Sequence, residues 1–312
     1  MRTGYYTHPD CRLHEMGMHH PECPQRLAAI DDRLIASGID WAVQRREDFP
    51  LADEGAMELA HSALLLAELR EKGKVEEGYA WIDPDTLMNP HTWQAIRRAA
   101  GAAIAATDAV LDGVIDNAFC AVRPPGHHAM REQAMGFCFV NNVAVAACHA
   151  LDVRGLERVA IVDFDVHHGN GTEDIFAGDE RVLMTSFFQH PFYPFSGTGN
   201  AAANMLNVPL PAYTGGARVR EVVQSQWLPR LRAFAPQMLF ISAGFDAHRD
   251  DDLGQMGLVE ADYAWITCAL REFAAQACEG RIVSCLEGGY NLSALGRSVV
   301  AHLRVLAGVD GS

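Results

Sequence analysis

Three ionisable side chains stand at alternate positions directly after one apolar run of the sequence. The run covers residues 159–162, and the side chains are Asp163, Asp165 and His167. In an extended segment alternate side chains point the same way, so two carboxylates and one imidazole are predicted to converge. Carboxylate oxygens and imidazole nitrogens are ligands for divalent metal ions. The spacing therefore predicts a metal site where this run ends.

A further acid, Asp246, follows a second apolar run at residues 239–243. Asp165, His167 and Asp246 would supply three protein ligands and leave a position open for water, as a catalytic zinc requires. Iron or cobalt could also occupy such an oxygen-rich site. One acid alone would more often be a salt-bridged strand end or a helix cap. Three acids and a histidine at strand ends favour a metal site.

Two adjacent histidines, His127 and His128, follow the apolar run 119–122 and the turn 123–126, which contains two prolines and a glycine. A rigid turn that presents imidazoles suits general acid and base chemistry, because proton transfer needs a group that titrates near neutrality at fixed geometry. The alternative is a solvent-exposed loop pair, since His19-His20 shows that paired histidines alone are a weak signal.

Tyr290 follows the apolar run that ends at Leu286 and the pair Gly288-Gly289. The glycines allow the backbone to approach a ligand closely. A phenol at this place could donate a hydrogen bond to a developing oxyanion. The alternative is a tyrosine that only packs in a loop.

The elements that must position these groups are predicted by the pattern of apolar runs. Near-continuous apolar strands separated by helices of about ten or more residues predict an α/β fold with a mostly parallel sheet covered on both faces. In such sheets sites form at the carboxyl ends of the strands, which is where the polar residues fall. The expected strands are 2–6, 118–122, 158–164, 182–187, 237–243 and 281–286, and the expected helices are 25–37, 92–111, 141–150, 217–234, 260–277 and 292–306.

Composition predicts one domain over residues 1–312. Hydrophobic residues make up 49% of the chain, and no polar linker divides it. No run approaches the roughly 18 apolar residues of a membrane span, and the N-terminus lacks the apolar stretch of a signal peptide, so we expect a cytoplasmic protein without membrane contact. The 8 cysteines are scattered without a Cys-x-x-Cys pair, which indicates reduced thiols.

The formal charge of −15 argues against nucleic acid as a partner, because binding to phosphates rests on clustered Lys and Arg. It favours cationic partners such as lysine-rich tails or polyamines. Solubility alone is an equally good reason for an acidic surface.

Five segments, taken in order, resemble the histone deacetylase family. A further match at His19 to Arg26 extends the resemblance over nearly the whole chain. Asn170, where class I members have Asp, and Glu287 before the glycine pair look like the class II branch and its bacterial amidohydrolase relatives. The resemblance implies the single-domain arginase-deacetylase fold, with a parallel sheet of about eight strands flanked by helices. The five segments are 123–128, 136–142, 163–171, 242–246 and 287–290.

The resemblance also implies a role for each matching residue in releasing acetate and a free amine from an acylated amine. His127, oriented by Asp163, would be the general base on the attacking water, and His128, next to Asn170, would help to protonate the leaving amine. Tyr290 would stabilise the oxyanion, and its presence implies an active member. The zinc ligands would be Asp165, His167 and Asp246, and a potassium ion would be held by Asp163, Asp165, His167, Ser186 and Phe187.

The family resemblance implies a narrow acyl-lysine tunnel. Phe137 would line one wall, and Gly289 would let the backbone approach the substrate. The opposite wall would be Tyr193 or Phe195, because residues 191–199 are longer than the usual family pattern. Core packing is the alternative for either aromatic residue.

Leu253 aligns with the position where polyamine-specific relatives carry an acidic gatekeeper, so an acetyl-lysine protein or peptide is the expected substrate. Asp250 to Asp252 lie beside Leu253, and a shift of one residue would supply the missing carboxylate, although a solvated loop run is the simpler interpretation. An acetylpolyamine is therefore the alternative substrate, and a small acylated metabolite ranks third.

Two rival functions remain from other classes of protein. A non-catalytic acyl-lysine binding subunit is disfavoured by the intact ligand set. An arginase-type enzyme with two manganese ions is disfavoured because His168 and Asn170 do not complete a second cluster. The sequence leaves homo-oligomerisation open.

Overall fold

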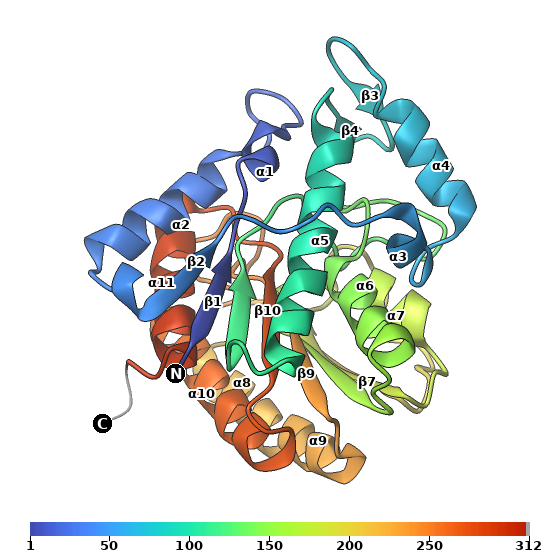
Figure 1. Ribbon diagram of the computed structural model, residues 1–312. Helices are drawn as coiled ribbons and strands as arrows, with labels where there is room; N and C mark the ends of the chain where they lie inside the picture. The colour runs from blue at the N-terminus through green and yellow to red at the C-terminus, as the bar shows by residue number, and fades with distance from the viewer. Residues whose placement is uncertain (310–312) are drawn as a thin grey trace.

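A parallel sheet of eight strands organises residues 1–309, the part of the chain that the computed structural model describes (Figure 1). The strand order is β2-β1-β5-β10-β9-β6-β7-β8, and every pairing within the sheet is parallel. The predicted α/β fold with about eight strands is confirmed. Residues 310–312 of the predicted domain lie outside the described residues. The strands are β1 Thr3–Tyr6, β2 Val43–Arg46, β5 Asn117–Cys120, β6 Val159–Asp163, β7 Val182–Gln189, β8 Met205–Leu210, β9 Met238–Ala243 and β10 Ile282–Leu286.

Helices cover both faces of the sheet (Figure 1). Helices α2, α10 and α11 pack together as one group, and α5, α6 and α7 form another. The long helices α5 and α11 bury one apolar side each, as helices that lie on a sheet must. The helices are α1 Asp10–Leu13, α2 Gln25–Ala36, α3 Glu54–Glu58, α4 Ala63–Lys72, α5 Thr92–Leu111, α6 Asn142–Cys148, α7 Asn170–Phe176, α8 Gly216–Val222, α9 Leu228–Phe234, α10 Glu260–Ala277 and α11 Leu292–Leu306.

The central strands position the site because every residue in them is buried. All residues of β5, β6, β9 and β10 are inaccessible to solvent, and most of them are apolar. A parallel sheet covered on both faces requires this pattern. The carboxyl ends of these four neighbouring strands therefore form one rigid rim, on which polar side chains can be placed.

The edge strands β2 and β8 were not predicted from the sequence. Strand β2 reads Val-Gln-Arg-Arg and exposes its charged residues, and β8 contains Pro209, which only an edge strand tolerates. Neither segment carries the apolar run that marks a central strand. A short antiparallel ribbon, β3 Ala80–Trp81 with β4 Leu87–Met88, was missed for the same reason.

The expected helix 217–234 is one helical segment with a change of winding in its middle. Helices α8 and α9 are joined by a π-helical turn at Val223–Trp227, which buries Trp227 against Phe187 with ring centroids 5.5 Å apart. Helix α6 likewise continues into a π-helical turn at His149–Val153. No helix in the described part of the chain is long and apolar enough to cross a membrane.

A buried histidine, His302 in α11, makes stability depend on pH. Its ring lies between the hydroxyls of Thr267, 2.7 Å from Nδ1, and Ser284, 3.0 Å from Nε2. Burial lowers the pKa of His302 to about 3, whereas a histidine in the unfolded chain titrates near about 6.5. Between these values only the unfolded state binds the proton, so the stability present above pH ~6.5 falls as the pH drops.

We expect His302 alone to reduce the free energy of unfolding by about 2 kcal/mol between pH ~7 and pH ~5. Urea unfolding of the metal-free protein at the two pH values measures this change. His302→Gln keeps a donor and an acceptor but does not titrate, so its loss of stability should be smaller by that amount. An equal pH dependence of both proteins would contradict the assignment.

Candidate active site

A bend after β6, and not a continued extended segment, brings Asp163, Asp165 and His167 together. Strand β6 ends at Asp163, and residues 165–167 form the bend. Asp163 Oδ1 accepts the backbone N–H of Asp165 at 3.0 Å, and Asp165 Oδ1 accepts that of His167 at 2.8 Å. Two successive Asx turns, in each of which a carboxylate accepts the backbone N–H two residues ahead, therefore bring the three side chains together. The expectation that residues 163–167 form one extended segment is wrong.

The three predicted metal ligands form a buried cluster whose ligand atoms all lie within 4.8 Å of one another. His167 Nδ1 lies 3.0 Å from Asp165 Oδ1 and 3.3 Å from Asp246 Oδ2. The other oxygen of Asp246 accepts the backbone N–H of Val166 at 2.9 Å. The ends of β6 and β9 thus place two carboxylates and one imidazole around a common point.

Two observations fit a cation at this point. Asp246 Oδ2 is buried and has no hydrogen-bond partner among the described residues, and such an acceptor is costly unless something satisfies it. Two glycines also leave room around the carboxylates. A Cβ on Gly288 would lie 1.9 Å from Asp246 Oδ2, and one on Gly244 would lie 2.0 Å from Asp165 Oδ2. The donor set and the space fit zinc, and they also fit iron or cobalt.

The electrostatics of the cluster favour positive charge. Burial, together with the charge of Asp165, raises the pKa of Asp246 to about 7. Burial alone would raise the pKa of Asp165, but His127 and His167 hold it below its usual range. Burial alone would lower the pKa of His167, but its close contacts with the two acids raise it to about 10. A divalent cation would supply the positive charge that these two acids attract.

Glu287 holds the turn that carries the histidine pair. Its Oε2 accepts the backbone N–H of Gly126 at 2.6 Å and that of His127 at 3.0 Å. The carboxyl is fully buried, and burial raises its pKa to about 7. The sequence marked Glu287 only by resemblance, so this structural role was missed. It depends on a contact between residues 160 positions apart.

The structure places His127 beside Asp163 and His128 beside Asn170. His127 Nδ1 is 3.0 Å from Asp163 Oδ2, and its Nε2 faces Asp165 Oδ2 at 3.8 Å. His128 Nδ1 is 2.7 Å from the side-chain oxygen of Asn170. Burial alone would lower the pKa of His127, but the charges of Asp165 and Asp163 raise it well above the usual value. Burial and the neighbouring imidazoles lower the pKa of His128 well below that value.

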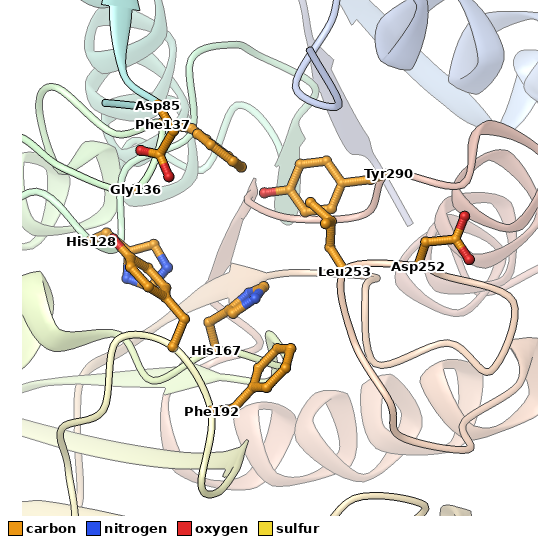
Figure 2. Close-up of a pocket in the computed structure, with 10 residues that line it drawn as sticks. Asp85, His128, Gly136, Phe137, His167, Phe192, Asp252, Leu253 and Tyr290 are labelled. Carbon is orange, nitrogen blue, oxygen red and sulfur yellow. The ribbon is translucent and has the colours of Figure 1, made fainter. Parts of the chain in front are cut away.

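A cavity of about 280 Å³ opens onto this group of side chains (Figure 2). Figure 2 shows the Tyr290 hydroxyl pointing toward the middle of the cavity, with Phe137 and Leu253 beside the ring. Burial raises the pKa of Tyr290 well above the usual value, so the phenol stays protonated and can donate. The lining residues are Asp85, His128, Gly136, Phe137, His167, Phe192, Tyr193, Asp252, Leu253 and Tyr290.

The walls of the cavity differ in part from the prediction. Phe137 and Tyr193 line it, but Phe195 does not and is instead a residue 75% exposed on the surface. Phe192 was missed, and its ring stacks on His167 at a centroid distance of 5.4 Å. Gly289, which was expected to approach the substrate, is buried and does not line the cavity; its φ is +119°, and its carbonyl accepts a hydrogen bond from Arg26 at 2.7 Å.

The acidic run beside Leu253 divides into three different environments. The Asp250 side chain is 45% exposed and lies 3.1 Å from Arg297 Nη2. Asp251 is buried, with 4% exposure, so the interpretation of the whole run as solvated is wrong. Asp252 and Leu253 line the cavity.

The residues implied for potassium lie at the end of β6, in the bend that follows it, and within β7, which continues past Phe187 to Gln189. Asp163 and Ser186 are paired directly across these two strands. The Ser186 hydroxyl donates to Asn207 Oδ1 at 3.2 Å, and Phe187 is buried. Asp165 and His167 belong to the cluster described above. The structure thus places three of the five residues at or after the end of β6 and the other two within the neighbouring strand β7.

The fold and the site together define a class, an α/β protein with a candidate metal centre at the carboxyl ends of its parallel strands. A model of the histone deacetylase domain matches residues 20–306. The chain therefore belongs to the histone deacetylase family. Its fold is the arginase-deacetylase fold, because the crystal structure of the HDA15 HD domain matches it with a TM-score of 0.93 and 34% identity, over 98% of this chain and 88% of that one.

Two relatives named for a hydrolase activity are similar along nearly the whole chain. The histone deacetylase-like amidohydrolase of Pseudomonas aeruginosa is 35% identical over 99% of this chain and 87% of its own length. The polyamine deacetylase HDAC10 of Homo sapiens is 35% identical over 99% of this chain, which spans 48% of that protein. Membership in a family of deacetylases and amidohydrolases supports an enzymatic role.

Proposed function

We propose that this protein is a zinc-dependent deacylase that hydrolyses the amide of an acylated lysine side chain to acetate, or a related acid, and a free amine. The observation that carries the proposal is the convergence of the Asp165, His167 and Asp246 cluster with His127 and His128 where the cavity opens. None of these groups alone would support the proposal, because metal ligands and packed histidines are also common in proteins without this activity.

Each side chain has a distinct role in this proposal. Zinc held by the three ligands would polarise the amide carbonyl and lower the pKa of water. A cation on Asp165 would offset part of the negative charge that raises the pKa of His127. His127, oriented by Asp163, would then remove a proton from the attacking water, and His128 would deliver one to the leaving amine. The Tyr290 hydroxyl donates a hydrogen bond to the oxyanion as it forms.

The cavity walls favour an acyl-lysine substrate. Phe137, Phe192 and Tyr193 supply aromatic surface to the cavity, which suits the aliphatic chain of lysine. Leu253 lines the cavity at the predicted gatekeeper position, where a carboxylate would hold a distant ammonium group. An uncharged leucine gives no such contact and therefore favours a protein or peptide.

An acetylpolyamine is the second candidate substrate, and two carboxylates favour it. Asp85 and Asp252 both line the cavity, and no Lys or Arg in the described part of the chain does so. A polyamine carries further ammonium groups that such acids would attract. The name of the human relative, polyamine deacetylase HDAC10, supports this second candidate.

A potassium ion held near Asp163 and Ser186 and a cytoplasmic location are part of the same proposal. The cross-strand pairing of these two residues supports the ion.

All eight cysteines are unpaired, which fits a reducing compartment and supports the proposed cytoplasmic location.

Acetate release from the zinc-loaded protein tests the proposed function. We expect faster turnover of an acetyl-lysine peptide than of acetylated putrescine or spermidine, loss of activity after chelation, and recovery when zinc is restored. A preference for the polyamines would move the assignment to the second candidate. Peptide binding without release of acetate would instead indicate a non-catalytic binding subunit.

A further inference from the structure

The buried carboxylate of Asp251 binds two segments of the cavity wall that are distant in sequence. Its Oδ2 accepts the backbone N–H of Tyr290 at 2.6 Å and that of Asn291 at 2.9 Å. Its Oδ1 accepts the backbone N–H of Leu253 at 3.0 Å. Both oxygens are therefore used, and they face the two segments that carry Tyr290 and Leu253.

Tyr290 is held at its ring by Arg26 and Phe137 and at its backbone by Asp251. The guanidinium carbon of Arg26 lies 4.9 Å from the centre of the Tyr290 ring, and Phe137 meets that ring edge to face at 5.9 Å. Arg26 Nε also donates to the carbonyl oxygen of Gly289. The ring and the preceding carbonyl are thus held by Arg26, whereas the backbone N–H of Tyr290 is held by Asp251.

The chemistry of the contact requires a carboxylate. Three N–H groups point at the two oxygens of Asp251, and an ionised carboxylate can accept all of them. An asparagine has one acceptor oxygen, so its NH₂ group would face at least one N–H donor. Asp251→Asn therefore preserves size but breaks the bridge on one of its two sides.

We propose that Asp251 is a positioning residue, which sets the place of the Tyr290 hydroxyl and holds Leu253 on the same wall of the cavity. The inference rests on the proposed function, in which that hydroxyl donates to the oxyanion. Displacement of a reacting group by about 1 Å can cost about 10²-fold in rate. Asp251 touches no reacting atom and acts through Tyr290.

A double-mutant cycle separates this role from a general contribution to folding. Asp251→Asn is made in the wild-type protein and in Tyr290→Phe, and all variants are loaded with zinc. We expect a fall in kcat of about 10- to 100-fold for an acetyl-lysine peptide in the wild-type background, with KM changed less than about threefold. In Tyr290→Phe, which lacks the hydroxyl, the further fall should be less than about twofold.

Asp250→Asn is the matched control, because Asp250 is the adjacent acid, faces Arg297 and does not line the cavity. It should leave kcat unchanged. An equal loss caused by Asp251→Asn in both backgrounds would overturn the proposal, as would a rise in KM at constant kcat. If Asp251→Asn does not fold, Asp251→Glu, which keeps the charge but displaces the oxygens, is measured in the same cycle.

Hydrogen exchange gives a readout that does not depend on activity. We expect Asp251→Asn to exchange faster than Asp250→Asn at the backbone amides of residues 290 and 291, whose acceptor is weakened. Unchanged exchange would overturn the positioning role even if the wild type hydrolyses no acyl amide. If the wild type shows no turnover but Asp251→Asn exchanges faster, the proposed function would be rejected, whereas the role of Asp251 in holding the backbone of residues 290 and 291 would still be supported.

Discussion

Replacing Asp246 with asparagine is expected to remove zinc binding and to lower kcat/KM for an acetyl-lysine peptide by at least about 10³-fold. Asp246 Oδ1 accepts the N–H of Val166, and the amide oxygen of asparagine can keep this bond. The NH₂ group would then stand where the unpaired Oδ2 is now, 3.3 Å from His167 Nδ1. An amide nitrogen is not a metal ligand, so the third ligand is lost while the fold is preserved.

Calorimetric titration with zinc and thermal unfolding with and without zinc measure this effect. Zinc at a thousandfold excess over its Kd should stabilise the wild type by about 4 kcal/mol and leave Asp246→Asn unchanged. Asp250→Asn serves again as the control from the following loop and should bind zinc as the wild type does. One equivalent of tightly bound zinc in Asp246→Asn, with activity retained, would refute the assignment of the ligand.

The sheet was predictable because its central strands are short apolar runs that end in polar residues. The runs before Asp163 and Asp246 give both the strand and the place where it stops. Strands β2 and β8 lack this signal, since an edge strand can expose charged residues or contain proline. Their place in the sheet is set by pairing with a neighbour distant in sequence, which a local pattern does not contain.

The candidate ligands were predictable by residue type, but their geometry was not. Alternation along a strand predicts that Asp163, Asp165 and His167 share a face, whereas the chain leaves the strand and bends after Asp163. The bend depends on carboxylates that accept backbone N–H groups two residues ahead. Sequence spacing alone does not distinguish this arrangement from a continued strand, because both bring the same side chains together.

Asp251 and Phe192 show why parts of the cavity wall were missed. Three consecutive acids are typical of a solvated loop, but Asp251 is buried because N–H groups 39 and 40 positions away meet its carboxylate. Phe192 stacks on His167 in a segment that is longer than the family pattern, so alignment by motif pointed to its neighbours Tyr193 and Phe195. Long-range contacts decide both cases, and neither leaves a local signal in the sequence.

Replacing Tyr290 with phenylalanine is expected to lower kcat by about 10²- to 10³-fold with little change in KM. Phenylalanine keeps the ring that packs between Arg26 and Phe137, so only the hydroxyl is removed. Burial keeps that hydroxyl protonated, which makes it a donor throughout the neutral pH range. A donor that acts mainly on the developing oxyanion stabilises the transition state more than the bound substrate, and its loss therefore affects kcat.

Steady-state kinetics of Tyr290→Phe with an acetyl-lysine peptide, at equal zinc content, measure this prediction. Phe137→Leu is a useful contrast, because it alters the wall of the cavity without removing a donor and should chiefly raise KM. Unchanged kcat in Tyr290→Phe would show that the oxyanion is stabilised without this hydroxyl. In that case the fixation of Tyr290 by Asp251 and Arg26 would serve the shape of the cavity alone, because no reacting group would depend on it.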